Sequence, residues 1–397
     1  MNIIDRFKKY VSIESTAGEE KADTCSDNKM LVLADLLLEE LQALKPDEIS
    51  INQFGVVDAK FLGDSTKPMI ALLAHMDTSP SASDKDVKTR IVDYKGGDIK
   101  LNDTLSLKAS EFPSLKHSVS HQLMVTDGTT LLGGDDKAGI AIIMDSLIAI
   151  LDGKKKHRSL EIIFTTDEEI GADAEHVSMD LVKAKYGYTV DGGDSKYLSI
   201  ESFTAYSMKV LVQGKSIHPG SAKNKLVNAS NVLIHFQNAL PEFLRPEDTE
   251  AKEPFFHLCN INGNEDKAVG DFIIRSFDDD QIQQMIELAK LTARRINDSL
   301  GYEALTLEIK PSYRNMKLVL DKHPEITNEI EGIYKSLNMA YEYEAVRGGT
   351  TGSQLSFMGL PCPNLGTGDY NCHGRMEYVD LDEMKQMAEV VKKLMEA

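Results

Sequence analysis

The sequence has no tryptophan, only four cysteines among 397 residues, and fewer basic than acidic residues, with 44 Lys and Arg against 63 Asp and Glu. The cysteines show no CxxC spacing, which argues against a disulfide framework and against a thiolate zinc site. The formal charge of -19 argues against binding to nucleic acid or to an anionic membrane surface, because phosphate groups require clustered Lys and Arg.

Long apolar runs are also absent, so no segment is expected to span a bilayer. The first residues, "MNIIDRFKKYVSIES", follow an amphipathic helix pattern and lack the apolar centre and cleavage site of a secretion signal. We therefore expect a cytoplasmic protein. The 42% of hydrophobic residues can fill packed cores, and 397 residues predict more than one domain.

Helical and strand-like segments alternate through the first half of the chain, as in an α/β protein. Helices are expected where apolar residues recur at helical spacing, and buried strands where a short apolar run ends in polar residues. The predicted helices are 28–44 and 138–151, and the predicted strands are 68–78 and 159–169.

A different order follows: strand, helix, two strands, a long helix from Asp279 to about Leu300, and a last strand. The long helix has one apolar stripe, formed by Ile282, Ile286, Ala289, Ala293 and Ile296. This β-α-β-β-α-β order predicts a small two-layer α+β, ferredoxin-like domain. We place it at 206–315, inserted into a larger α/β domain made of 1–205 and 316–397.

Polar residues interrupt the apolar pattern where strands of the larger domain should end, which is where open α/β sheets bind ligands. Each position has an ordinary explanation when taken alone. Acidic pairs such as Asp135–Asp136 and Glu168–Glu169 are usually solvated helix starts, and Asp191 before two glycines fits a turn. His75 and His373 could be ordinary core or surface histidines.

Taken together, five of these residues form a mixed nitrogen and oxygen ligand set that suits zinc better than calcium or magnesium: His75, Asp135, Glu169, Asp191 and His373. Five ligands are more than one open zinc site needs, and they suit two ions that share a carboxylate. The charges agree, because three carboxylates and one hydroxide balance two divalent ions. Asp77 lies two residues after His75 and could orient its imidazole.

Long ordered motifs then identify a family, among them "AHMDTSP", "TDGTTLLGGDDKAGIA", "TTDEEIG", "RGGTTGSQLSFMGLPCPNL" and "HGRMEYV". The sequence resembles the peptidase T branch of the two-zinc metallopeptidases, which also include aminoacylases and glutamate carboxypeptidase. The resemblance implies a mixed-sheet catalytic domain with helices on both faces. It also implies a tripeptide aminopeptidase with two zinc ions per subunit, for which cobalt or manganese could substitute.

The resemblance assigns roles to single residues. The five ligands match those of the family, with Asp135 bridging the two ions and Asp77 standing behind His75. Glu168 matches the general base, which takes a proton from the zinc-activated water and returns it to the departing amine. The Asp135–Asp136 peptide bond is expected to be cis.

The inserted domain also has counterparts in the family. His218 resembles the histidine that stabilises the oxyanion, although a histidine that shapes the turn before Pro219 is the alternative. Arg275 and Arg347 resemble the arginines that hold the C-terminal carboxylate of the peptide, a task suited to a planar bidentate cation. A homodimer through this domain is expected as well.

The chain departs from the family at three places. Gly134 stands where alanine is usual, "EEIGADA" lacks a basic residue after the glutamate pair, and Thr351 stands where aspartate is common. The last change leaves open a dipeptidase or an N-acyl amino acid deacylase on the same scaffold. A magnesium phosphotransferase is disfavoured by the two histidines and the missing P-loop, and a purely binding protein by the presence of Glu168.

Overall fold

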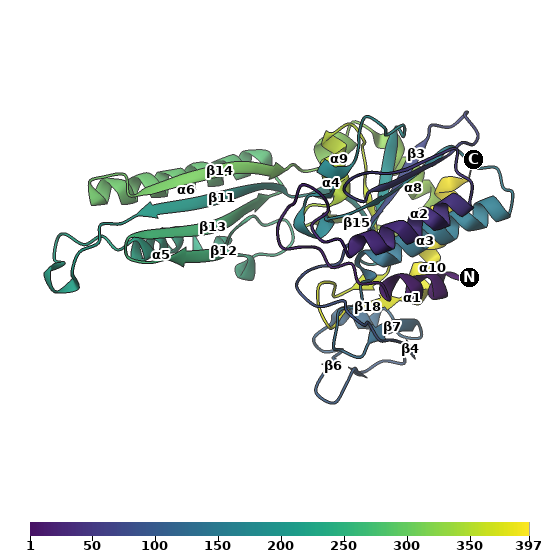
Figure 1. Cartoon of the computed structure of the whole chain (residues 1–397), viewed down its shortest axis with the longest axis horizontal. Helices are drawn as coiled ribbons and strands as arrows, with labels where there is room; N and C mark the ends of the chain where they lie inside the picture. The colour runs from purple at the N-terminus through teal and green to yellow at the C-terminus, as the bar shows by residue number, and fades with distance from the viewer. Residues whose placement is uncertain (397) are drawn as a thin grey trace. The chain divides into compact units, whose positions relative to one another are not determined.

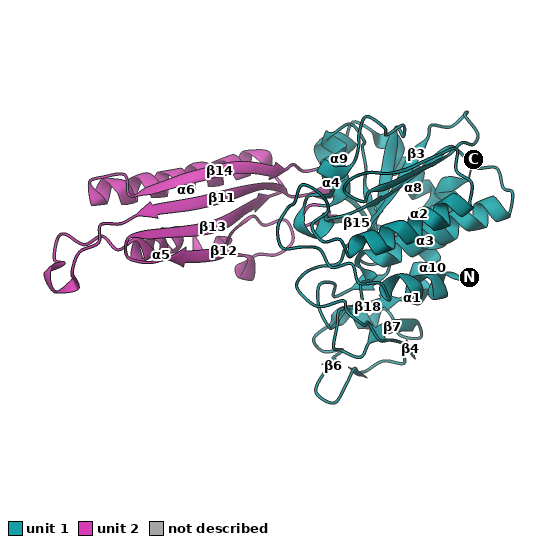
Figure 2. Cartoon of the chain, in the orientation of Figure 1, with its two compact units in different colours: residues 1–200, 316–344, 350–397 teal, residues 201–315, 345–349 magenta. Residues whose placement is uncertain are grey.

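The computed structural model describes residues 1–396 (Figure 1). The chain forms two compact units (Figure 2): unit 1 contains Met1–Ile200, Met316–Glu344 and Thr350–Ala397, and unit 2 contains Glu201–Asn315 and Ala345–Gly349. Unit 2 therefore starts at Glu201 rather than at residue 206, and it includes a second, short segment that the order of elements did not predict.

Unit 1 is built on an eight-stranded mixed sheet. Its strand order is β1 (Glu48–Ile51), β2 (Val57–Phe61), β8 (Leu160–Thr165), β3 (Ile70–His75), β9 (Tyr186–Val190), β16 (Asn364–Leu365), β10 (Tyr197–Ser202) and β15 (Glu342–Val346). Strand β3 pairs in parallel with both β8 and β9, and every residue of these three strands is buried. Their carboxyl ends therefore meet at one edge of the sheet.

Helices cover both faces of this sheet. Leu72 of β3 points into a core that it shares with helices α1 (Ile3–Val11), α2 (Met30–Ala43), α3 (Gly134–Asp152), α8 (Pro324–Ser336) and α10 (Leu381–Met395). Its neighbour Leu73 points to the opposite face and packs in a second core with residues of α4 (Asp173–His176) and α9 (Thr351–Phe357). The mixed α/β fold class is therefore confirmed.

A second sheet of unit 1 consists of short strands that the sequence did not indicate. Its order is β17 (Asp369–Tyr370), β18 (Tyr378–Asp380), β7 (Gln122–Thr126) and β4 (Thr89–Asp93). A two-stranded sheet of β5 (Ile99–Lys100) and β6 (Ser106–Leu107) and the short helix α7 (Lys317–Leu320) complete the unit. Strands β17 and β18 pair antiparallel, so the turn between them presents His373.

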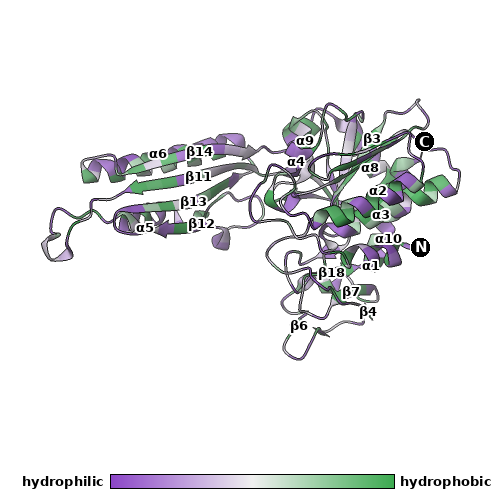
Figure 3. Cartoon of the chain, in the orientation of Figure 1, coloured by the Kyte–Doolittle hydropathy of each residue, from purple (hydrophilic) through white to green (hydrophobic). Residues whose placement is uncertain are grey.

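Unit 2 has the predicted order of elements: β11 (Thr204–Gln213), α5 (Ala229–Ala239), β12 (Phe255–Gly263), β13 (Lys267–Ser276), α6 (Asp279–Leu300) and β14 (Leu305–Tyr313). Its antiparallel sheet has the order β12-β13-β11-β14, and both helices share one core with it. Figure 3 shows hydrophobic and hydrophilic residues alternating along α6, and its predicted apolar stripe is buried. No helix in the described part of the chain has the length and apolar character needed to cross a membrane.

Candidate metal centre

The parallel strands of unit 1 bring predicted ligands together at their carboxyl ends. His75 is the last residue of β3, Asp191 directly follows β9, and the Glu168–Glu169 pair forms the turn η2 (Glu168–Ile170) just after β8. These three strands are neighbours in the order β8-β3-β9. Side chains that are distant in the sequence are therefore held at one edge of the sheet.

Asp135 reaches the same place by another route. It does not directly follow a strand, since β7 ends at Thr126, and it lies instead at the start of α3 with a non-helical backbone. Gly133, with φ of +80°, permits the turn before it. The Asp135–Asp136 peptide bond is cis, as the resemblance predicted.

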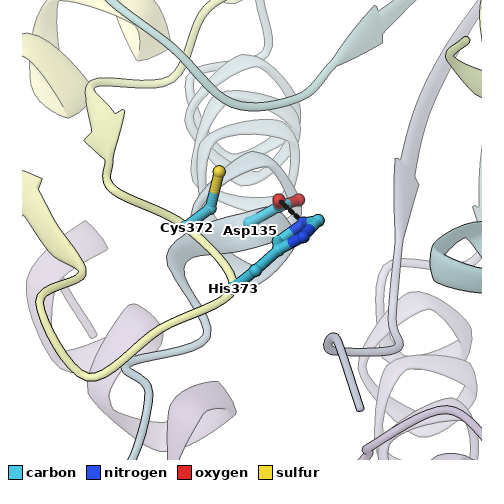
Figure 4. A group of neighbouring side chains, drawn as sticks. All are labelled: Asp135, Cys372 and His373. Carbon is cyan, nitrogen blue, oxygen red and sulfur yellow. Dashed lines mark hydrogen bonds and ion pairs between the residues drawn. The ribbon is translucent and has the colours of Figure 1, made fainter. Parts of the chain in front are cut away.

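The carboxylate of Asp135 divides the centre into two sides. Its Oδ1 lies 2.8 Å from Nε2 of His75, and that nitrogen lies 3.8 Å from Oδ1 of Asp191. Its Oδ2 lies 3.1 Å from Nε2 of His373, which is also 3.1 Å from Oε2 of Glu169 (Figure 4 shows the contact between Asp135 and His373). Each carboxylate oxygen thus faces a different imidazole and a different second carboxylate, which is the arrangement expected of a bridging ligand.

The electrostatics indicate that a cation belongs here. Burial and the neighbouring Asp135 carboxylate raise the pKa of Asp191 to about 8. Hydrogen bonds to Asp135 and Glu169 raise the pKa of His373 to about 11. The Glu169 side chain is only 4% exposed, and its Oε1 has no hydrogen-bond partner within residues 1–396. The nitrogen and oxygen donors and this unpartnered oxygen fit divalent metal ions.

Asp77 connects two parts of the centre. Nδ1 of His75 lies 2.9 Å from the backbone oxygen of Asp77 and 3.6 Å from its Oδ1. The Asp77 carboxylate accepts hydrogen bonds from the backbone amides of Glu168 (3.2 Å) and Glu169 (3.0 Å). The residue therefore orients the imidazole mainly through its backbone, and its carboxylate fixes the turn that carries the two glutamates.

The surroundings of Glu168 increase the proton affinity of its carboxyl group. It is half-buried, and burial raises its pKa, with the negative charge of Asp191 adding to the effect. A carboxyl group tuned in this way suits general acid–base chemistry near neutral pH.

Thr351 has a carboxyl group beside it, although it is itself uncharged. Its hydroxyl donates a hydrogen bond to Asp173, which is fully buried. Burial raises the pKa of Asp173 to about 6. A carboxyl group of the "EEIGADA" segment therefore lies next to position 351.

Three predicted site residues belong to unit 2. His218 is exposed, and its Nδ1 accepts a hydrogen bond from the amide of Gly220, so it shapes the turn at Pro219. The guanidinium of Arg275 lies 5.1 Å from the ring centre of Tyr313. Arg347 stacks on Phe203 and Phe255 and donates hydrogen bonds to the oxygens of Ala251, Glu253 and Thr249.

Sequence reasoning missed Glu377, which holds the loop that carries Asp135. Its buried carboxylate accepts hydrogen bonds from four consecutive backbone amides, those of Leu132 (2.6 Å), Gly133 (2.9 Å), Gly134 (2.6 Å) and Asp135 (3.2 Å). Glu377 lies within the "HGRMEYV" motif, but its amide partners are more than two hundred residues away. Only the position of an acidic residue in a motif could have suggested it.

Known proteins resemble this chain in sequence and in fold. The model of peptidase family M20/M25/M40 matches residues 121–397. A peptidase T from Caldanaerobacter subterraneus subsp. tengcongensis is 38% identical over 99% of this chain and 98% of its own. Two crystal structures share the fold: a tripeptidase from Staphylococcus aureus (TM-score 0.79, 18% identity, 99% and 97% covered) and a dinuclear metal-binding M20 peptidase from Bacillus subtilis (0.62, 14%, 99% and 96%).

Proposed function

The chain belongs to peptidase family M20/M25/M40, and from this premise we propose that it is a metal-dependent aminopeptidase that releases the N-terminal residue from tripeptides. The observation that carries the proposal is the two-sided environment of Asp135, whose two oxygens each face an imidazole. The full-length similarity to peptidase T supports tripeptides as the substrates.

The centre would hold two divalent ions, and we propose zinc, with cobalt or manganese as substitutes. His75 and Asp191 would hold one ion, Glu169 and His373 the other, and Asp135 both. When bound, such ions would lower the pKa of water, so that hydroxide is available at neutral pH to attack a peptide carbonyl, and they would polarise that carbonyl.

Glu168 would act as the general base and acid. It would take a proton from the attacking water and return that proton to the departing amine. The backbone amides of Glu168 and Glu169 both donate hydrogen bonds to the Asp77 carboxylate, which fixes the two residues relative to each other. Two adjacent glutamates would thus have different roles: Glu169 would bind metal, and Glu168 would transfer the proton.

We propose that unit 2 supplies substrate contacts. Arg275 and Arg347 would bind the C-terminal carboxylate of the peptide, and His218 would stabilise the oxyanion. Arg347 also orders the 249–253 loop through its hydrogen bonds. A homodimer through unit 2 and a cytoplasmic location stay predictions, which sedimentation and cell fractionation would test.

The decisive experiment measures amino acid release from a tripeptide by metal-free and zinc-loaded protein. The expected result is release of the N-terminal residue only after metal addition, with little reaction on the matching dipeptide or on the N-acetylated tripeptide. Preferred hydrolysis of the dipeptide would instead identify a dipeptidase. Preferred hydrolysis of N-acetyl amino acids would identify a deacylase.

A further inference from the structure

Asp167 lies between β8 and the turn that carries Glu168 and Glu169, and its backbone has an unusual conformation. The residue is 1% exposed, and its φ is +68°, in the left-handed region that residues with a side chain seldom adopt. The Ala172 amide donates a hydrogen bond to the backbone oxygen of Asp167 at 2.9 Å, which closes the turn. The conformation of Asp167 therefore sets the direction in which the chain enters the turn and presents Glu168.

Two other segments hold the Asp167 carboxylate. Its Oδ1 and Oδ2 accept hydrogen bonds from the backbone amide of Ser26 at 3.2 Å and 3.0 Å, and Oδ1 also accepts one from the Ser26 hydroxyl. Nδ1 of His176, in α4, lies 3.5 Å from Oδ2, and the His176 ring stacks on Phe54. A left-handed residue persists where its surroundings over-determine its conformation, and these contacts have that effect.

Ser26 is itself fixed within the N-terminal segment. Its hydroxyl oxygen accepts a hydrogen bond from the amide of Gly18 at 2.7 Å, which closes the loop 18–26. Just before this loop, the amide of Ala17 donates a hydrogen bond to the backbone oxygen of Thr78 at 2.9 Å. The segment is thus attached both to the chain that follows β3 and to the chain that follows β8.

We propose that Asp167, held in place by Ser26, is a positioning residue that fixes the orientation of the Glu168 carboxylate. The inference rests on the proposed function, in which Glu168 transfers the proton. Asp77 holds the amides of Glu168 and Glu169, so it fixes the turn itself, whereas Asp167 fixes the way the chain enters the turn. A displacement of about 1 Å at a reacting group can lower a rate by about a hundredfold.

The test compares kcat and KM for a tripeptide in zinc-loaded, full-length variants. Asp167→Gly permits the left-handed backbone without strain but removes the carboxylate, and Ser26→Ala removes the hydroxyl. In both variants kcat should fall by about tenfold or more while KM stays within about twofold, because the base is misplaced and substrate binding is not changed. Ser26→Thr, which keeps a hydroxyl, should recover most of the lost kcat.

Ser12→Ala is the matched control for Ser26→Ala. Ser12 also lies in the N-terminal segment, and its hydroxyl donates a hydrogen bond to the backbone oxygen of Lys9 at 2.6 Å. This variant should have the kcat and KM of the wild type.

A double variant separates positioning from a general structural role. If Ser26 acts through Glu168, Ser26→Ala should have little further effect on the residual kcat of Glu168→Gln. A full additional loss in that background would overturn the inference, as would an unchanged kcat in either Ser26→Ala or Asp167→Gly, or a change confined to KM.

The same measurements separate this inference from the proposed function. Loss of turnover in Glu168→Gln, with normal kcat in Ser26→Ala and Asp167→Gly, would overturn only the role of Asp167. Near-normal turnover in Glu168→Gln would overturn both the assigned base and the inference that depends on it.

Discussion

At the scale of single residues, Glu168 offers the most direct test of the proposed chemistry. The Glu168→Gln variant keeps the size of the side chain but cannot accept a proton, so turnover of a tripeptide should fall by about 10²- to 10⁴-fold. Metal content, measured by atomic emission, should not change, because Glu168 is not one of the proposed ligands. Glu175→Gln, at an exposed residue of α4, should keep full activity. Near-normal turnover by Glu168→Gln would refute the assigned base.

Substitutions at Gly134 and Asp369 are predicted to have effects on stability that depend on each other. A Cβ atom at Gly134 would lie 2.3 Å from Oδ1 of Asp369 and 2.6 Å from Cγ2 of Val379, so Gly134→Ala should lower the free energy of unfolding by about 1–3 kcal/mol. Asp369 is 1% exposed, and neither of its carboxylate oxygens has a hydrogen-bond partner within residues 1–396.

Removing the Asp369 carboxyl should therefore recover part of the lost stability. The double variant Gly134→Ala/Asp369→Gly should be more stable than the sum of its single changes predicts, as measured by urea unfolding. Strictly additive effects would show that the two residues do not share this space.

The candidate ligands could be predicted from the sequence because each of them breaks a local pattern. His75 ends one apolar strand, and Glu169 and Asp191 come after two others, so these residues stand out as a set although each has an ordinary explanation alone. Glu377 could not be found in this way, since its role depends on amides brought to it by tertiary folding. The same holds for Asp173, whose partner Thr351 lies in another element.

At the scale of elements, Arg158 ties the start of β8 to α8. Its guanidinium is 1% exposed and donates hydrogen bonds to the backbone oxygen of Pro68 (2.9 Å), the Tyr186 hydroxyl (2.9 Å) and the Glu329 carboxylate (2.7 Å). Arg158→Met would remove the donor to the Pro68 oxygen and to Oε1 of Glu329, although Oε2 of Glu329 keeps hydrogen bonds from the Tyr186 and Tyr188 hydroxyls. The variant should lower the free energy of unfolding by about 3–5 kcal/mol.

An exposed ion pair on the same helix serves as the control for Arg158. Nζ of Lys335 lies 2.8 Å from Oε2 of Glu331 on the surface of α8, and Lys335→Met should lower the free energy of unfolding far less than Arg158→Met does. If denaturant unfolding gave equal losses of unfolding free energy for the two variants, burial would not explain the effect of Arg158→Met.

Glu383, at the start of α10, should make stability depend on pH. Burial raises its pKa to about 7 from an ordinary value of 4.5, and the charges of Asp194 and Asp380 add to this effect. Its carboxylate accepts hydrogen bonds from the Ser195 amide and the Tyr370 hydroxyl, both at 3.0 Å. Between these two pKa values the folded state binds the additional proton, so the contribution of Glu383 to stability falls as pH rises from about 4.5 to 7.

The matched variant for this prediction is Glu383→Gln, which cannot ionise. Relative to Glu383→Gln, the wild type should lose up to about 3 kcal/mol of unfolding free energy between pH 5 and pH 8. When the stabilities of the two proteins are subtracted, the contributions of the titratable groups that both contain cancel. A difference that stays constant with pH, or grows in favour of the wild type, would refute the raised pKa.

Long elements could be predicted because their periodicity extends over many residues, whereas the short ones lack such a pattern. The predicted stripe of α6 is buried as a set, and β3 and β8 are mostly apolar and fully buried. Strands β16 and β17 have two residues each, too few for a period of two to be recognised. Their place is set by pairing with β9, β10 and β18.

At the scale of the whole molecule, the two units should respond differently to metal. Each unit has its own hydrophobic core, and all five proposed ligands belong to unit 1. An ion that binds only the folded protein stabilises it by RT ln(1 + [L]/Kd), or about 2.7 kcal/mol at a hundredfold excess over Kd. This stabilisation should be confined to the unit that contains the ligands.

Hydrogen exchange with and without a chelator would measure this. Chelation should accelerate exchange in β3 and in the first turns of α3, and leave α6 and β13 of unit 2 unchanged. Asp135→Asn should reproduce the effect of the chelator in unit 1, because it removes the carboxylate that faces both imidazoles. Equal acceleration in both units would mean that the metal stabilises the chain as one cooperative body, and no change anywhere would mean that the Asp135 cluster does not bind metal.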